Sequence, residues 1–483
     1  MKRSDIALAA VVVVSRAPFL AAGYGSDTDT WKVANAARQI GLTGRYVASR
    51  LPGFPVQEWV SALFWRGGPV ALNALTAAFT TVAAVLFARY FRESGGRDSF
   101  LAGLAFACVP TIYISSTSAI DYLWAMAFLM GAFLAANRGW IFATALALSL
   151  ATGARITSAC FVLPLALVLG GARPGAGSGR RAITMAAAAA GMSAAIFLPV
   201  YLRYGSGFLS YYEPYGGNSY GAGKFFSGIL IPGRAPFPLS LILGQATVEV
   251  WGLLGCVALA LALVGGWIRR HADDHELPRP TRASRWAWGL ACTFMVILYL
   301  RLPHDEGYLI PMVPFVLLFV ASWTRRRVFQ GLALAIVISP FVLGLDVEPP
   351  KKGLSPDVRS PLCWRIQLGH SERFVLDALR GPLIEDYDKR VRTMRVVQST
   401  LAALASIPPR ARVIVGAAGP ELFDSLPGPI PPNRFFNTMS RREFEAFRAA
   451  GDPVYVLPDA AERTQRAEGY DPMKLGAIAL LSN

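Results

Sequence analysis

Two carboxylates, Asp27 and Asp29, directly follow the first apolar stretch of the chain, in the segment Gly25-Ser-Asp-Thr-Asp-Thr-Trp31. A carboxylate in such a loop can take the proton of a hydroxyl group as that group attacks another atom. The same spacing also fits the start of a helix, with one residue as the N-cap and the other in the first turn. The sequence predicts that one of the two is a general base and leaves open which one.

Further charged residues lie at the ends of later apolar stretches and in the same first loop. Arginine offers phosphate a fixed and permanently charged fork of donors, and nearby carboxylates can order such arginines or a sugar. The residues predicted to bind substrate or lipid phosphate are Arg155, Asp121, Arg301, His304, Arg50 and Glu58.

Each of these residues also has a structural alternative. Asp121 could cap a helix, and Arg155 could extend from its helix to the membrane surface. Arg50 and Glu58 could form an ion pair, because both lie in Arg50-Leu-Pro-Gly-Phe-Pro-Val-Gln-Glu58. His304 could be a solvated loop residue.

The composition places these residues in a membrane protein. The 483 residues are 54% hydrophobic and 16% charged, with a mean hydropathy of +0.41, whereas soluble domains have about 25% charged residues. Eleven apolar segments approach the length of about 20 residues that a bilayer requires. They are residues 5–22, 69–90, 99–117, 120–136, 139–154, 156–171, 183–202, 239–267, 286–301, 308–323 and 328–345. The first is interpreted as a retained helix, and 54–66 as a helix at the membrane surface.

The basic residues predict the orientation. With a cytoplasmic N-terminus, the segments 1–4, 89–98, 137–138, 171–182, 268–286 and 324–327 lie inside and contain 17 Lys and Arg. The outside loops are about twice as long in total and contain 10. Because cytoplasmic loops are enriched in Lys and Arg, this orientation is favoured, and it places the first loop (23–68) outside. It also accounts for much of the net charge of +16 without a nucleic-acid partner.

The last part of the chain has the pattern of a soluble domain. Residues 346–483 contain 19 basic and 17 acidic residues and follow the eleventh span, so they are expected outside the cytoplasm. Arg412-Val-Ile-Val-Gly416 and Pro453-Val-Tyr-Val-Leu457 predict strands, and Ser440 with Glu443 predicts a helix with a capping box. The expected architecture is an all-α membrane bundle (1–345) with a small soluble α/β domain (346–483).

With its acidic first outer loop, many spans and outer C-terminal domain, the chain resembles the C-type fold of integral-membrane glycosyltransferases. These include the protein O-mannosyltransferases and the aminoarabinose–lipid A transferases. The motifs that carry the resemblance are the acidic pair, Leu51-Pro-Gly-Phe-Pro55, Asp121, Arg155 and Gly307-Tyr-Leu-Ile-Pro311. The family's Asp-Glu pair is Asp-Thr-Asp here, and its Lys is Arg155.

The resemblance implies transfer of a sugar from a polyprenyl-phosphate donor to a protein, lipid or polysaccharide at the outer face of the cytoplasmic membrane. Asp27 or Asp29 would be the base and, if a divalent cation takes part, its ligand; no other cofactor is expected. Four tyrosines between Tyr211 and Tyr220 would gate the substrate or anchor the chain at the interface. The alternatives are a transporter or flippase, in which charges lie near the midplane of repeated halves, and a non-catalytic outer scaffold.

Overall fold

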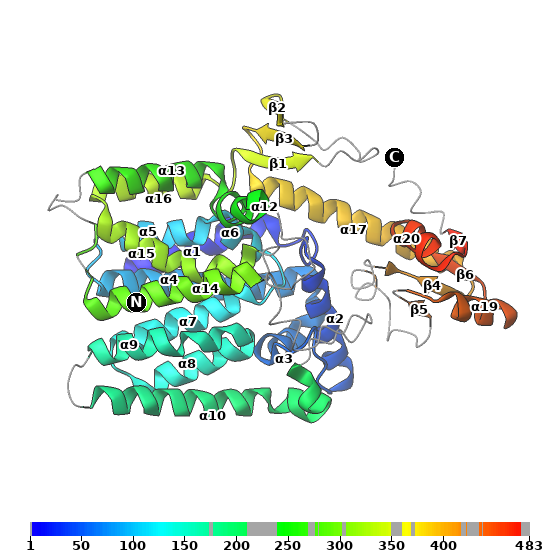
Figure 1. The fold of residues 1–483 in the computed structure, drawn as a ribbon, viewed down its shortest axis with the longest axis horizontal. Helices are drawn as coiled ribbons and strands as arrows, with labels where there is room; N and C mark the ends of the chain where they lie inside the picture. Colours follow the sequence, from blue (N-terminus) through cyan, green and yellow to red (C-terminus); the bar gives the residue numbers. More distant parts are fainter. Residues whose placement is uncertain are drawn as a thin grey trace.

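The computed structural model describes residues 2–172, 177–209, 239–268, 276–278, 280–301, 306–348, 360–368, 372–416, 422, 434–436 and 438–474. Most of the helices lie side by side in one bundle, and a smaller α/β part projects beyond one end of it (Figure 1). The first helix begins at the opposite end of the bundle, so the N-terminus and the α/β part lie far apart.

The bundle consists of helices that are apolar over most of their length. In chain order they are α1 (Arg3–Arg16), α4 (Gly68–Glu93), α5 (Ser99–Cys108), α6 (Pro110–Ser116), α7 (Tyr122–Asn137), α8 (Ile141–Ala154), η3 (Ile156–Phe161), α9 (Val162–Ala172), α10 (Ser178–Tyr204), α12 (Leu239–Gly244), η5 (Gln245–Glu249), α13 (Val250–Ile268), α14 (Arg282–Arg301), η6 (Glu306–Met312), α15 (Val313–Trp323) and α16 (Arg326–Ile338). Among the described residues, five helices are long and apolar enough to cross a membrane, or up to six with the bent pair α5 and α6. The chain is a multi-pass membrane protein, and the number of eleven spans stays a prediction.

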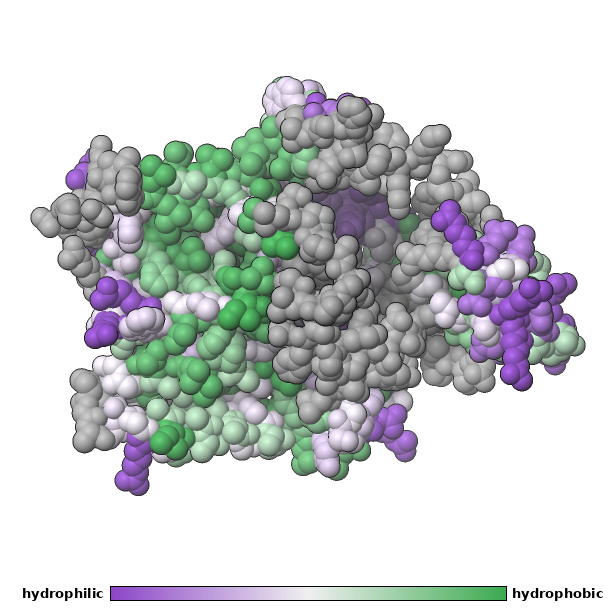
Figure 2. All heavy atoms as spheres, viewed as in Figure 1, coloured by the Kyte–Doolittle hydropathy of each residue, from purple (hydrophilic) through white to green (hydrophobic). Residues whose placement is uncertain are grey.

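The burial of side chains on a helix of the bundle depends on how many other helices surround it. Helix α7 is apolar on every side and packs against α4, α8 and α9, so nearly all of its side chains are buried, as expected for a helix without a polar face. Helix α10 instead exposes apolar side chains such as Leu198 and Leu202. On the face shown in Figure 2, apolar side chains gather over the bundle, whereas hydrophilic side chains gather at the far end of the α/β part. Exposed apolar surface of this extent fits contact with lipid.

The predicted span 99–117 is broken. Helix α5 ends before Val109, and Pro110 begins α6 at an angle of 71° to it, because proline cannot donate the next helical hydrogen bond. The guanidinium of Arg16 donates to the carbonyl of Ala107 and, at 3.2 Å, to the hydroxyl of Ser116. Backbone groups away from water need such internal partners, so the buried Arg16 stabilises the break.

The first loop contains two helices that lie at one end of the bundle (Figure 1). They are α2 (Thr28–Thr43) and α3 (Pro55–Phe64), and short turns η1 (Ala17–Phe19) and η2 (Trp65–Gly67) connect them to α1 and α4. Helix α2 ends at Gly44, whose φ of 67° favours glycine. Helix α3 confirms the predicted helix at 54–66 and exposes Trp59 and Leu63; its place at the membrane surface stays a prediction.

The remaining chain forms two sheets joined by a long helix. Strands β1 (Gly344–Glu348), β3 (Glu372–Asp377) and β2 (Cys363–Leu368) pair antiparallel in that order. Helix α17 (Pro382–Ser406) then leads to a parallel sheet with the order β5 (Phe435–Phe436), β4 (Arg412–Ile414), β6 (Val454–Val456) and β7 (Met473–Lys474). Helices α19 (Arg441–Ala449) and α20 (Pro458–Glu468) connect its strands. We call β4–β7 with α19 and α20 the C-terminal unit.

The structure confirms the elements predicted in this region. Strands β4 and β6 lie within the two predicted segments, and α19 has the predicted capping box between Ser440 and Glu443. The antiparallel sheet was not predicted, and its first strand begins at Gly344, just before the predicted domain boundary. That boundary, and a soluble C-terminal domain, stay predictions.

Candidate functional site

Four charged side chains from three separate parts of the chain form one connected cluster, which we call the ion cluster. Asp29 Oδ2 lies 3.2 Å from Arg50 Nη1, and Arg50 Nη2 lies 2.7 Å from Asp121 Oδ1. The other oxygen of Asp121 lies 2.5 Å from Arg155 Nη1. The predicted residues Asp29, Arg50, Asp121 and Arg155 are therefore brought together by the fold.

The ends of helices position three members of the ion cluster, and a loop positions the fourth. Asp29 lies in the first turn of α2, and Asp121 directly precedes α7. Arg155 has an extended backbone between α8 and η3, so its side chain emerges where the helix is interrupted. Arg50 lies in the loop before α3, where its carbonyl accepts a hydrogen bond from Gly53 N at 2.8 Å.

Exposure is graded across the ion cluster. The side chain of Asp121 is fully buried, those of Arg155 and Arg50 are 7% and 13% exposed, and that of Asp29 is 28% exposed. Asp29 is therefore the more accessible carboxylate of the ion cluster, while the buried Asp121 pairs with both arginines. Arg50 Nη1 is buried and forms an ion pair with Asp29, but it makes no hydrogen bond within the described residues.

Opposing influences set the protonation of Asp29. Burial by itself raises the pKa of the carboxyl, but Arg50, Lys32 and Arg155 together lower it below its ordinary value. Conversely, the pKa of Arg50 is raised: burial lowers it, and the charges of Asp29 and Asp121 outweigh that effect. Asp29 is therefore ionised at neutral pH, and its Oδ1 also pairs with Lys32 at 3.1 Å.

Aromatic rings flank both arginines. The guanidinium carbon of Arg155 lies 3.9 Å from the ring centre of Tyr122 and 4.5 Å from that of Tyr308. Arg50 lies 4.2 Å from the ring centre of Phe54. Such stacking restrains the guanidinium plane. Sequence reasoning missed these contacts, although Tyr122 adjoins Asp121 and Tyr308 lies in the motif 307–311.

Asp27 differs from Asp29. It is the N-cap of α2, and its Oδ1 accepts a hydrogen bond from the backbone N–H of Asp29 at 2.9 Å. The structural alternative for Asp27 is thus confirmed, because an N-cap acceptor satisfies one of the orphan donors of the first turn. The cap also orients the turn that carries Asp29.

Glu58 lies in a separate group. Its fully buried carboxylate accepts hydrogen bonds from the hydroxyl of Tyr46, from N and Oγ of Ser49 at 2.6 Å each, and from Phe54 N at 3.0 Å. We call these residues the Glu58 cluster. The ion pair considered between Arg50 and Glu58 is not formed, since Arg50 turns to Asp29 and Asp121. Glu58 holds together the loop that presents Arg50.

Some predicted residues cannot be placed. His304 and the segment 211–220 lie outside the described residues, as does the side chain of Arg301, the last residue of α14. Within the described part of the chain, no group of three or more His, Cys, Asp or Glu is arranged to hold a metal ion. A divalent cation with Asp27 or Asp29 as ligand stays a prediction.

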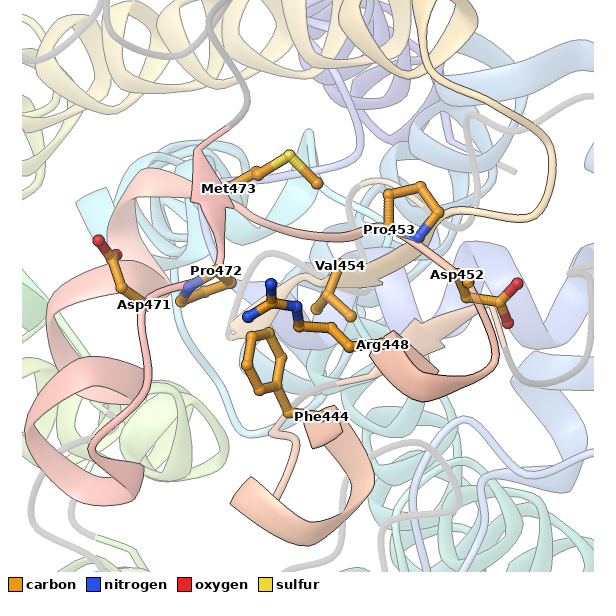
Figure 3. Close-up of a pocket in the computed structure, with 9 residues that line it drawn as sticks. Phe444, Arg448, Asp452, Pro453, Val454, Asp471, Pro472 and Met473 are labelled. Carbon is orange, nitrogen blue, oxygen red and sulfur yellow. The ribbon is translucent and has the colours of Figure 1, made fainter. Parts of the chain in front are cut away.

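A pocket of about 340 Å³ lies in the C-terminal unit, away from the ion cluster. Residues of α19, of the turn before β6 and of the start of β7 line it (Figure 3). The guanidinium of Arg448 lies over the ring of Phe444, whereas the carboxylates of Asp452 and Asp471 point away from the centre. None of the sequence-predicted site residues lines this pocket.

Comparison with known proteins identifies the fold. No protein-family model matches the chain, and no curated protein matches its sequence at a significant level. Among solved structures, the chain is similar to ArnT from Cupriavidus metallidurans bound to undecaprenyl phosphate, with 11% identity, a TM-score of 0.51, and coverage of 99% of this chain and 90% of that one. ArnT in the apo state is similar with 17% identity and a TM-score of 0.45 over 66% of this chain. That second match spans 58% of the ArnT chain.

The match to lipid-bound ArnT concerns the fold. ArnT is an aminoarabinose–lipid A transferase of the C-type fold, which is the fold that the sequence motifs predicted. The C-type fold is therefore confirmed as the overall fold, whereas the eleven spans and the soluble C-terminal domain stay predictions.

Proposed function

We propose that this protein is a membrane glycosyltransferase that moves a sugar from a polyprenyl-phosphate donor to an acceptor at the outer face of the membrane. The observation that carries the proposal is the ion cluster, in which one partly exposed carboxylate lies beside two arginines. The shared fold with ArnT in its complex with undecaprenyl phosphate supports a lipid-linked phosphate as the anionic part of the donor.

In this proposal Asp29 is the general base. It is ionised and is the most exposed carboxylate of the ion cluster, whereas Asp27 is engaged as the N-cap of α2. The hydroxyl oxygen of the acceptor attacks the anomeric carbon, and the bond from that carbon to the phosphate oxygen breaks. The proton of the hydroxyl passes to Asp29, the electron pair leaves with polyprenyl phosphate, and the sugar inverts its configuration.

The arginines bind the phosphate and also tune the base. Arg155, stacked on two tyrosine rings, and Arg50, whose Nη1 lies beside Asp29 but makes no hydrogen bond within the described residues, offer donors for phosphate oxygens. A bound phosphate would partly neutralise these cations and add a negative charge near Asp29. Both effects raise the pKa of Asp29, because a like charge disfavours ionisation. The carboxylate would thus become a better proton acceptor when the donor is bound.

The proposed topology follows the basic residues. Those of the predicted inner segments pair with acidic neighbours, as in Arg89 with Asp5 at 2.9 Å and Arg326 with Asp98 at 2.6 Å. Eleven spans with a cytoplasmic N-terminus would place α2, α3 and the C-terminal unit outside. Reporter fusions at residue 325 and at the C-terminus should report opposite sides of the membrane.

Two single variants test the mechanism. In a deletion strain, wild-type protein and Asp27→Asn should restore the missing glycan, because asparagine caps a helix about as well as aspartate. Asp29→Asn should leave the glycan absent and the lipid-linked donor accumulated, with a rate loss of about 10²–10⁴-fold. Mass spectrometry of lipids and glycans measures both. Full restoration by Asp29→Asn would show that Asp29 is not the base.

A further inference from the structure

Helix α17 crosses the end of the bundle at which α2 lies and then extends to the C-terminal unit (Figure 1). Near its start, the ring of Tyr387 meets that of Phe19 edge to face at 5.6 Å, which connects α17 to the end of η1. Leu383 is buried with Tyr113 of α6. The helix that carries the C-terminal unit is thus packed into the bundle itself.

Arg390 is the central contact of α17. Its side chain is 1% exposed, and its Nη1 donates to the carbonyl and hydroxyl oxygens of Thr117 at 2.7 and 3.1 Å. Its Nη2 donates to the carbonyl of Ile114 at 3.0 Å and pairs with Asp386 at 2.5 Å. Carbonyls at the C-terminal end of a helix such as α6 lack helical partners, and a cation there is favoured.

The segment that Arg390 holds leads directly into the ion cluster. Only three residues separate Thr117 from Asp121. Within this stretch Ala119 N donates to the carbonyl of Tyr24 at 2.7 Å. The ring of Tyr24 in turn packs edge to face on Trp31 of α2, at 5.1 Å between ring centres. The contacts of Arg390 therefore reach both carboxylate-bearing segments of the ion cluster.

The next turns of α17 contact the first loop directly. Val397 is buried with Trp31 and Ala34 of α2, and Met394 packs against this group. Gly23 has a φ of 95°, and a Cβ added there would lie 2.9 Å from Cγ of Met394. The turn before Asp27 thus requires glycine both for its backbone conformation and for the close approach of α17.

We propose that Arg390 is a positioning residue, and that the packing of α17 against the bundle maintains the geometry of the ion cluster. Arg390 touches no member of the ion cluster; it acts through the segment 114–121 and through Tyr24. An effect of Arg390 on donor binding rests on the proposed function. Its effect on the geometry of the ion cluster can be tested without that function.

Hydrogen–deuterium exchange of the full-length protein tests the structural dependence. Arg390→Ala should speed exchange in residues 20–31 and 114–121 by roughly fivefold or more, because local opening follows the loss of local contacts. Arg395→Ala is the matched control, since Arg395 is exposed on the same helix. Equal exchange in both variants would overturn the proposal, as would an increase spread evenly over the bundle.

Thr117→Val provides a milder variant that keeps the buried charge pair intact. It removes the hydroxyl that accepts from Arg390 and leaves both carbonyl contacts. Faster exchange confined to the same two segments, by roughly twofold, is expected. Faster exchange only outside residues 20–31 and 114–121 would contradict the proposed effect of Arg390 on the ion cluster.

Binding of undecaprenyl phosphate to the full-length protein tests the functional consequence. Arg390→Ala and Arg155→Ala should each weaken the affinity about tenfold, and the double variant should lose little more, because residues that act on one site are not additive. Additive losses would overturn a positioning role. If Arg155→Ala binds as wild type while the exchange pattern is as expected, the proposed function fails and the positioning role stands.

Discussion

Two carboxylate clusters lie in or beside the first loop (23–68) and differ in the kind of donor that surrounds them. Glu58 is buried among a phenol, a serine and backbone N–H groups, all neutral. Asp29 and Asp121 face guanidinium groups, and Asp29 retains exposed surface. Two carboxylates about 30 positions apart in the chain therefore lie in electrostatically different surroundings.

The difference shows how to separate a structural carboxylate from a reactive one. All donors around Glu58 belong to residues 46–54, so the interaction closes a loop on itself and leaves no place for a ligand. The ion cluster joins distant segments, keeps one buried donor of Arg50 without a hydrogen bond, and is open at Asp29. The predictions below test this distinction, beginning with the largest expected effect on folding or activity.

Replacement of Glu58 should mainly affect folding. Glu58→Ala leaves four donors without their acceptor in a buried site, which costs about 3–5 kcal/mol. The melting temperature of the purified protein should fall by several degrees. Asp29→Asn should leave it nearly unchanged, since that side chain is partly exposed. A larger loss of stability in Asp29→Asn than in Glu58→Ala would reverse the assignment of the two clusters.

Arg155→Lys should mainly affect activity. Lysine retains the charge but has neither the planar fork nor the stacking between Tyr122 and Tyr308, so sugar transfer should fall about 10–100-fold. Arg66→Lys is the control, because Arg66 is an exposed arginine beside a tryptophan ring and lies outside the ion cluster. Equal activity of the two variants would show that the ion cluster needs only a positive charge.

Arg50→Gln should change the pH dependence of transfer. The base works when ionised, so the rate is retained above the ordinary carboxyl pKa and is lost as the pH falls through the lowered pKa of Asp29. Without Arg50, one of the charges that outweigh the effect of burial is gone, and that pKa rises. The acid limb of kcat/KM should therefore move to higher pH; an unmoved limb would show that Arg50 does not set the pKa of Asp29.

The smallest effect is expected at Asp27. Asp27→Ala removes the N-cap acceptor of α2 and should cost about 1 kcal/mol, whereas Asp27→Asn should cost only a few tenths. Thermal unfolding of the two variants measures the difference. A severe loss of transfer in Asp27→Asn at unchanged stability would move the role of base from Asp29 to Asp27.

Much of the local structure could be predicted because it depends on neighbours in the sequence. The apolar stretches, the helix beginning near Asp27 and the capping box at Ser440 each depend on residues within one or two turns. The composition of the ion cluster was predicted in part, since charges at the ends of apolar helices are conspicuous. The pairing of its charged side chains was not predicted. From the sequence alone, Arg50 could pair as readily with Glu58, eight positions away, as with Asp121, 71 positions away.

The sequence by itself determined a helical membrane bundle, its favoured orientation and a short set of candidate residues, because periodicity and composition are local properties. Only the tertiary structure decided that Asp27 caps a helix, that Glu58 lies outside the ion cluster and that Asp29 pairs with Arg50, which in turn pairs with Asp121. It alone also connected Arg390 to Thr117 across 273 positions. Such pairings depend on how whole helices pack, and no pattern within a single segment encodes them.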